Sequence, residues 1–279
     1  MPAPDLSART DVAKDAVRQA GQLAMRYFRQ DLQSWDKAEN DPVSEADLAV
    51  DALLKETLLG SFPQDGWLSE ESVHDVAAAD ASPDYIWVVD PIDGTRAFID
   101  EKPHFTICVA LVWRGETQLG LVFNPAEDEF FEASLGGGAA CNDSPITVSG
   151  HRHLAGCRML GYRDMYADRH WRTPWPNIDI SIVNSIAYRV VLVACGVHDA
   201  VINLKPQNDW DIAAAELILR EAGGICTNRQ GDAYRFHGKG GKNQNVIAAN
   251  PVLQKKLVRK LEEFEPRIPK QANAVGQRD

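Results

Sequence analysis

The stretch Trp87-Val88-Val89-Asp90-Pro91-Ile92-Asp93-Gly94-Thr95 decides how this chain folds. Its beginning belongs to the apolar, β-rich run 85–89, which predicts a short buried strand. Two carboxylates follow, three positions apart, and the proline between them stiffens the backbone. Carboxylates at the end of one rigid element suit hard divalent cations such as Mg²⁺, which prefer oxygen ligands. We therefore expect Asp90 and Asp93 to bind a cation where the strand ends.

Gly94 and Thr95 extend this motif with a flexible residue and a hydroxyl group. Their backbone N–H groups begin a predicted helical segment, and such N–H groups bind phosphate readily. A strand followed by an ordinary Asp-Gly turn is the alternative interpretation of the same residues. Because cation ligands and an anion-binding turn lie within six residues of each other, the motif favours a site that handles phosphate.

The composition limits the classes of partner. The chain has 279 residues, is 44% hydrophobic and carries a net charge of −11. A protein this acidic is not expected to bind nucleic-acid polymers or anionic membrane surfaces. If it binds an anionic phosphate, it needs local positive charge, and bound cations would supply that charge.

The sequence also predicts a cytoplasmic protein. No run approaches the ~18 uninterrupted apolar residues of a membrane span, and the N-terminus lacks the basic and then apolar pattern of a signal peptide. The five cysteines are scattered and form no C-x-x-C pair, which favours reduced cysteines.

Hydrophobic periodicity predicts strands and helices in blocks, which favours layered sheets and helices over a barrel. Ser44 is a good N-cap for the second helix, whereas region 63–84 is expected to be irregular. The predicted helices are 11–29, 44–59, 187–195, 209–222 and 251–264, and the predicted strands are 85–89, 105–113, 118–123, 129–133, 159–162, 201–204 and 246–249.

Further carboxylates lie where loops or helix ends could bring them to the same place. Asp47 follows Ser44 in an S-x-x-D pattern, so helix capping alone would also explain it. Asp211 lies in the first turn of an apolar helix, so a favourable interaction with the helix dipole would also explain it. Glu70 and Glu71 would by themselves be read as a solvated loop. None of these four residues proves a metal site alone.

Together the acidic motifs resemble the inositol monophosphatase family of Mg²⁺-dependent, lithium-sensitive phosphatases. The resemblance covers residues 10–265, and the motifs follow one another in the order and at the spacing typical of the family. It implies an α+β fold, a layered α/β/α/β/α sandwich, with halves 1–150 and 151–265 around the site and a flexible tail at 266–279. The motifs that carry it are DPVSEAD (41–47), LSEES (68–72), WVVDPIDGTRAF (87–98) and NDWDIAAAELILREAGG (208–224).

The resemblance also implies roles for single residues. Glu70 and Thr95 would position the attacking water, and Asp47 would accept a hydrogen bond from Thr95. The implied metal ligands are Glu70, Asp90, the carbonyl of Ile92, Asp93 and Asp211. The implied substrate-binding residues are Gly94, Thr95, Arg96, Ser185 and Asp211.

The activity implied by the resemblance is hydrolysis of a phosphate monoester of a small metabolite by a homodimer that holds two or three Mg²⁺ ions. Where inositol-specific relatives place a glutamate, this chain has Asn203, and one extra residue lies in 205–209. These departures put inositol phosphate in doubt as the substrate. The variant DGTR (93–96) and the stretch SIAYR (185–189) look more like bacterial relatives that act on 3′-phosphoadenosine 5′-phosphate or on histidinol phosphate. A regulatory binding protein on the same fold is the alternative from another class. A sugar bisphosphatase is disfavoured because the chain is short.

Overall fold

The strand predicted from the opening motif is the second strand of a seven-stranded sheet. The computed structural model describes residues 6–30, 33–38, 41–72, 83–236, 242–243 and 245–265. The first pair, β3 and β4, is parallel, and every later pair is antiparallel. In spatial order the strands are β3 (Gly66–Ser69), β4 (Tyr85–Asp93), β5 (Thr106–Trp113), β6 (Glu116–Asn124), β7 (Glu129–Ser134), β8 (Gly138–Cys141) and β9 (Ser144–Pro145).

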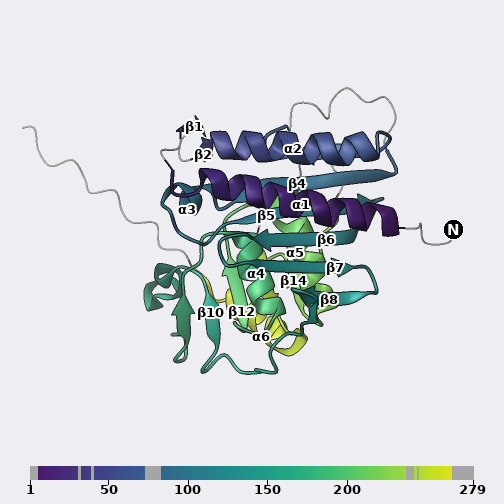
Figure 1. The fold of residues 1–279 in the computed structure, drawn as a ribbon. Helices are drawn as coiled ribbons and strands as arrows, with labels where there is room; N and C mark the ends of the chain where they lie inside the picture. Colours follow the sequence, from purple (N-terminus) through teal and green to yellow (C-terminus); the bar gives the residue numbers. More distant parts are fainter. Residues whose placement is uncertain are drawn as a thin grey trace, which may run out of the picture.

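Two helices cover one face of this sheet, α1 (Ser7–Tyr27) and α2 (Glu45–Ser61) (Figure 1). They pack against each other and against the central strands. Side chains on a strand alternate between its two faces. Trp87 and Val89 of β4 accordingly belong to the core beneath α1 and α2, whereas Val88 belongs to the core on the opposite face. Residues 85–89 of β4 are apolar because both faces of the strand are covered there.

The opposite face of the sheet is covered by α4 (Ile186–Ala194) and α5 (Asp209–Glu221). These two helices share one core with the first sheet and with a second, five-stranded sheet. The second sheet has the order β11 (Asp179–Ser181), β10 (Arg158–Leu160), β12 (Ala200–Asn203), β16 (Val246–Ala249) and β14 (Ile225–Thr227).

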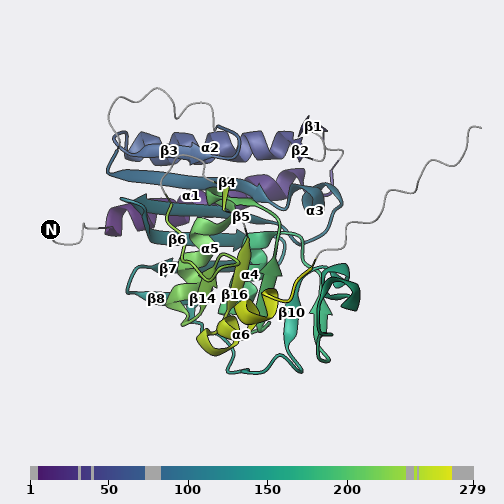
Figure 2. The same ribbon diagram turned by 180° about the vertical axis from the view of Figure 1, so that it is seen from behind.

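The outer face of the second sheet is covered by α6 (Pro251–Leu261) (Figure 2). Ala200 and Ile202 of β12 face α6, whereas Val201 faces the middle helices. The layers are therefore two helices, a sheet, two helices, a sheet and one helix. This arrangement confirms the predicted α+β fold and its α/β/α/β/α layering.

One glycine sets how closely the middle helices approach the first sheet. A Cβ atom on Gly120 of β6 would lie 2.5 Å from the carbonyl oxygen of Ala214 in α5. No side chain other than hydrogen fits at that separation. Gly120 therefore lets the backbone of α5 lie directly on the sheet.

Several short elements escaped the sequence prediction. The region expected to be irregular contains β3, which runs parallel to β4. A small antiparallel pair, β1 (Ser34–Ala38) and β2 (Asp41–Ser44), precedes α2. A second small pair joins β13 (Gln207–Asn208) to β15 (Lys242–Asn243). The helical segment that was predicted to begin at Gly94 and Thr95 is confirmed as the short α3 (Thr95–Ile99), which follows β4.

The predicted boundary near residue 150 and the predicted tail are not decided by the fold. The first sheet ends at Pro145 and the second begins at Arg158 along the chain, but α4 and α5 pack against the first sheet. The two halves stay a prediction, and the tail 266–279 lies outside the described residues. Within the described ranges, no helix has the length and apolar character needed to cross a bilayer.

Candidate metal centre

The end of β4 places Asp90 and Asp93 in the interior. The pairing of β4 with β5 is irregular between these two residues. Asp90 is 1% exposed, and its Oδ1 accepts a hydrogen bond of 3.0 Å from the N–H of Ile92. Gly94 follows with φ +97°, and a Cβ atom there would lie 2.8 Å from the carbonyl oxygen of His104. Only glycine suits this turn, since a side chain would meet both backbone strain and a clash.

Asp93 is held by the beginning of α4. Its Oδ2 accepts hydrogen bonds from the hydroxyl of Ser185 at 2.6 Å and from the N–H of Ala187 at 2.7 Å. Ser185 is fully buried and is the N-cap of α4, where its hydroxyl oxygen also accepts from the N–H of Tyr188. The expected contact between Ser185 and substrate stays a prediction. Its observed role is to position Asp93.

A third carboxylate reaches the same place from α5. Carboxylate oxygens of Asp90, Asp93 and Asp211 all lie within 4.8 Å of one another. Asp211 is the third residue of α5, and its Oδ2 accepts a bond of 2.6 Å from the N–H of Asn208. Asp211 lies in the first turn of α5, as predicted, and it also completes a capping box with Asn208 that the sequence analysis did not anticipate.

These carboxylates surround one cavity of about 180 Å³. Its wall brings together eight of the predicted site residues, which come from β4, α3, α5 and the segments next to them. Arg96 is exposed and also lies along this wall. The predicted residues that line the cavity are Glu70, Asp90, Ile92, Asp93, Gly94, Thr95, Arg96 and Asp211.

Burial and mutual repulsion make ionised carboxylates costly here. Burial raises the pKa of Asp90 well above its ordinary value, and the neighbouring acids raise it further. Burial also raises the pKa of Asp211, with Asp93 as the next contribution. The pKa of Glu70 rises to about 7 and that of Asp93 to about 6, again mainly through burial.

This donor set fits a hard cation. All of the side chains that converge are carboxylates, which are the ligands that Mg²⁺ prefers. Several buried carboxylates in one place are tolerated when they are paired with positive charge or coordinate a metal. Burial, together with the neighbouring acids, raises the pKa of Asp90 and Asp211, and a bound cation would offset this cost of ionisation. Glu70, Asp90, Asp93 and Asp211 are the side chains that could hold Mg²⁺.

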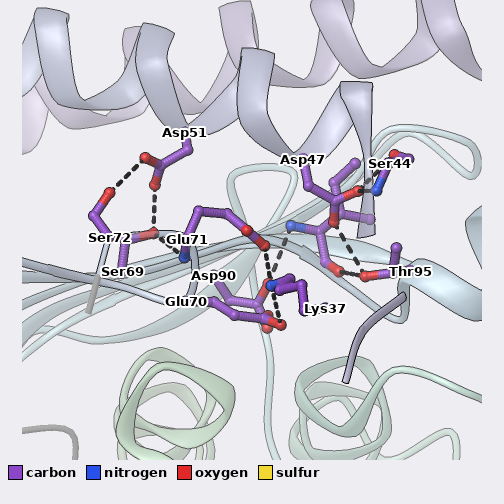
Figure 3. A network of polar contacts seen from close by, with 11 residues as sticks. Lys37, Ser44, Asp47, Asp51, Ser69, Glu70, Glu71, Ser72, Asp90 and Thr95 are labelled. Carbon is purple, nitrogen blue, oxygen red and sulfur yellow. Dashed lines mark hydrogen bonds and ion pairs between the residues drawn. The ribbon is translucent and has the colours of Figure 1, made fainter. Parts of the chain in front are cut away.

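Asp47 connects the second helix to this cavity (Figure 3). Ser44 is the N-cap of α2 and forms a capping box with Asp47, so the predicted capping role is confirmed. Asp47 also accepts a hydrogen bond of 3.1 Å from the hydroxyl of Thr95. The Thr95 hydroxyl lies at the same distance, 3.1 Å, from the carbonyl oxygen of Ile92. Asp47 therefore caps the helix and orients Thr95.

Glu70 and Glu71 are held by contacts that the sequence did not reveal. The N–H of Glu70 donates to the carbonyl of Val89, which extends the pairing of β3 with β4. Ser69 and Ser72 on either side both donate to Asp51 of α2. Figure 3 shows this group next to the cluster around Asp90. The acidic pair is thus anchored on both sides and is not a freely solvated loop.

Lys37 is a charged residue of the site that the sequence analysis missed. Its Nζ lies 3.1 Å from Glu70 and 2.5 Å from Glu71, and Figure 3 shows it reaching between them. Burial alone would lower the pKa of Lys37, but the two glutamates raise it above its ordinary value. Lys37 comes from β1, so this hairpin supplies positive charge to the edge of the cavity.

The fold and the cavity together describe a layered α+β protein with an oxygen-donor site where the first sheet meets the middle helices. The chain belongs to the inositol monophosphatase family, whose model matches residues 5–265. This finding confirms the resemblance seen in the sequence.

Individual relatives carry different names. The Nus factor SuhB of Escherichia coli (strain K12) is 33% identical over 262 residues, which cover 89% of this chain and 93% of that protein. A histidinol-phosphatase of Chlorobaculum parvum is 31% identical over 261 residues, covering 91% of this chain and 95% of that protein. The solved structure of an inositol monophosphatase from Anabaena (Nostoc) matches with a TM-score of 0.75 at 26% identity, covering 94% of this chain and 98% of that chain.

Proposed function

We propose that this protein is a Mg²⁺-dependent phosphatase that hydrolyses a phosphate monoester of a small metabolite. The observation that supports this most strongly is the convergence of Asp90, Asp93 and Asp211 within 4.8 Å, beside a threonine whose hydroxyl is held by a buried acid. Membership of the inositol monophosphatase family supports the same activity.

In this proposal the cations are held by the side chains of Glu70, Asp90, Asp93 and Asp211 and by the carbonyl of Ile92. Two or three Mg²⁺ ions, when bound, would neutralise charge on the phosphate and leaving group and acidify a water molecule. Phosphoryl transfer depends mostly on such positioning and charge neutralisation, because little covalent work is left to side chains.

The chain's own residues would orient the nucleophile. The Thr95 hydroxyl has one hydrogen, which it donates to Asp47 or to the carbonyl of Ile92. Its oxygen lone pairs stay available to accept a hydrogen from water. Glu70 would accept the other hydrogen as the general base.

The remaining residues would bind the ester. The backbone N–H groups of Gly94 and Thr95 at the start of α3 would contact the phosphate. Arg96, Ser185 and Asp211 are proposed contacts to phosphate or alcohol, with Ser185 acting through the Asp93 that it already positions. We further propose a cytoplasmic homodimer, to be checked by light scattering of the purified chain.

The specific ester and a second role are also proposals. The relative named as a histidinol-phosphatase favours histidinol phosphate as one candidate substrate, and a 3′(2′),5′-bisphosphate nucleotidase is the other specific activity. The relatives named as Nus factor SuhB favour a regulatory binding role as the candidate from another class.

A phosphate-release screen tests the proposal. Inositol 1-phosphate, 3′-phosphoadenosine 5′-phosphate, histidinol phosphate and fructose 1,6-bisphosphate would each be assayed with Mg²⁺, with EDTA, and with added lithium. We expect release from at least one ester that requires Mg²⁺ and is inhibited by lithium. Glu70→Gln should abolish it, whereas Glu56→Gln on the exposed face of α2 should not. A purely regulatory protein would release no phosphate and would retain its binding role in Glu70→Gln.

A further inference from the structure

A second cavity adjoins the candidate metal centre on the side of the second sheet. Its volume is about 130 Å³. Asp93 lines both cavities, so the two spaces meet at this carboxylate. The second cavity draws its other walls from the segment after β10, from α4 and from the end of β12. Its lining includes Asp93, Tyr162, Asn184, Arg189, Asn203 and Lys205.

Two positively charged side chains lie close to one aromatic ring in this cavity. The Arg189 guanidinium lies 5.3 Å from the centroid of the Tyr162 ring, and the Lys205 ammonium lies 5.7 Å from it. The negative face of an aromatic ring attracts such cations. Tyr162 thus brings two like charges to one place, although they repel each other.

Arg189 is fixed in position. It is 4% exposed, and it donates to the carbonyl oxygens of Val183 and Asn184. Asp93 lines the same cavity, so its carboxylate compensates part of the Arg189 charge at the boundary between the two cavities.

Lys205 has no comparable compensation. It is exposed at the rim, and its ammonium has no ion pair with a carboxylate in the part of the chain that the structure describes. Two basic side chains therefore line this rim, whereas carboxylates line the metal centre.

We propose that Lys205, supported by Arg189 and Tyr162, binds a second anionic group carried by the alcohol part of the substrate. This inference rests on the proposed function and refines it. With the scissile phosphate at the first cavity, the leaving alcohol extends past Asp93 into the second one. A phosphate or carboxylate on that alcohol would then meet the ammonium of Lys205. The substrate class is a phosphate monoester with a second negative group, and an ester of a neutral polyol lacks the group that Lys205 would bind.

Pairs of substrates with the same scissile ester test this subsite in the full chain with Mg²⁺. Adenosine 3′,5′-bisphosphate is compared with adenosine 3′-phosphate, and fructose 1,6-bisphosphate with fructose 1-phosphate, for a second phosphate. 3-Phosphoglycerate is compared with glycerol 1-phosphate for a carboxylate. Hydrolysis of p-nitrophenyl phosphate, which carries no second anionic group, measures the basal phosphatase activity. The enzymes are wild type, Lys205→Met, Lys205→Arg and, as the matched control, Lys255→Met on the exposed side of α6.

We expect wild type to prefer the doubly charged member of at least one pair by about tenfold or more in kcat/KM. Lys205→Met should lower kcat/KM for that member by about 10- to 100-fold, mostly by raising KM. One hydrogen bond to a charged group supplies a factor in this range. The singly charged member should change less than about twofold. Lys205→Arg should retain most of the preference, and Lys255→Met all of it.

Equal kcat/KM for both members of every pair in wild type would overturn the subsite, as would an equal loss for both members in Lys205→Met. If p-nitrophenyl phosphate is hydrolysed and these pairs show no preference, only the subsite is wrong. If no ester is hydrolysed with Mg²⁺, the proposed phosphatase function is wrong, and the subsite is rejected with it.

Discussion

Replacing Asp90 by asparagine should stabilise the metal-free protein and remove its response to Mg²⁺. The amide oxygen can still accept from the N–H of Ile92, so the exchange deletes charge and little else. Two unit charges within 4.8 Å repel by about 3–4 kcal/mol at an effective dielectric of ~20. Because the raised pKa of Asp90 already relieves part of this repulsion by protonation, we expect a gain of about 2 kcal/mol at pH 8.

Thermal unfolding measures this gain. At about 2–4 °C per kcal/mol, Asp90→Asn should unfold roughly 4–8 °C above wild type in EDTA at pH 8. Mg²⁺ at about 100 times its Kd should stabilise wild type by about 2.7 kcal/mol and the variant far less. Asp15→Asn, on the exposed side of α1, is the control for a general charge effect. A variant that unfolds below wild type in EDTA, or that gains as much from Mg²⁺, would refute the assignment.

Three further outcomes are expected. Thr95→Val loses the hydroxyl that donates to Asp47, so phosphate release should fall by about 100-fold or more while circular dichroism stays that of wild type; retained turnover would contradict the role of Thr95. In EDTA, the free energy of unfolding should decrease as the pH rises from 5 to 8, because the raised pKa of Glu70, about 7, lets the folded state bind an extra proton below that pH. A free energy of unfolding, measured by urea titration, that increases over this range would contradict it. Asp199, paired with Arg158, has a pKa lowered to about 2. Asp199→Asn should therefore lower the free energy of unfolding by about 2 kcal/mol at pH 7, and its difference from wild type should shrink as the pH falls from 4 towards 2. A loss of stability that does not depend on pH would point to packing instead of charge.

The elements that the sequence predicted well are those whose stability is visible locally. The first part of β4, residues 85–89, is a continuous apolar run, and α5 has helical apolar spacing, a capping residue and a glycine stop. The capping box at Ser44 needs only residues three positions apart. The predicted positions of Asp47, Asp90 and Asp211 follow from these local patterns together with the family resemblance.

The rest depends on partners that are distant in the sequence. The strand β3 has four residues, too few for a clear alternation, and forms because β4 offers it a partner. The ion pairs of Lys37 join β1 to glutamates 33 and 34 positions away. No pattern around Lys37 indicates them. The contact of two cations with Tyr162 likewise requires three segments to meet in the fold.

The hydrogen bonds from Ser185 and Ala187 to Asp93 join segments that the ribosome makes at different times. A nascent chain that has left the ribosome only as far as β9 already carries the first sheet, yet it lacks both these donors and Asp211. On the proposed assignment, such an intermediate would hold acidic groups with no complete cage for divalent ions. On this proposal, a complete Mg²⁺ site can form only after translation has passed α5.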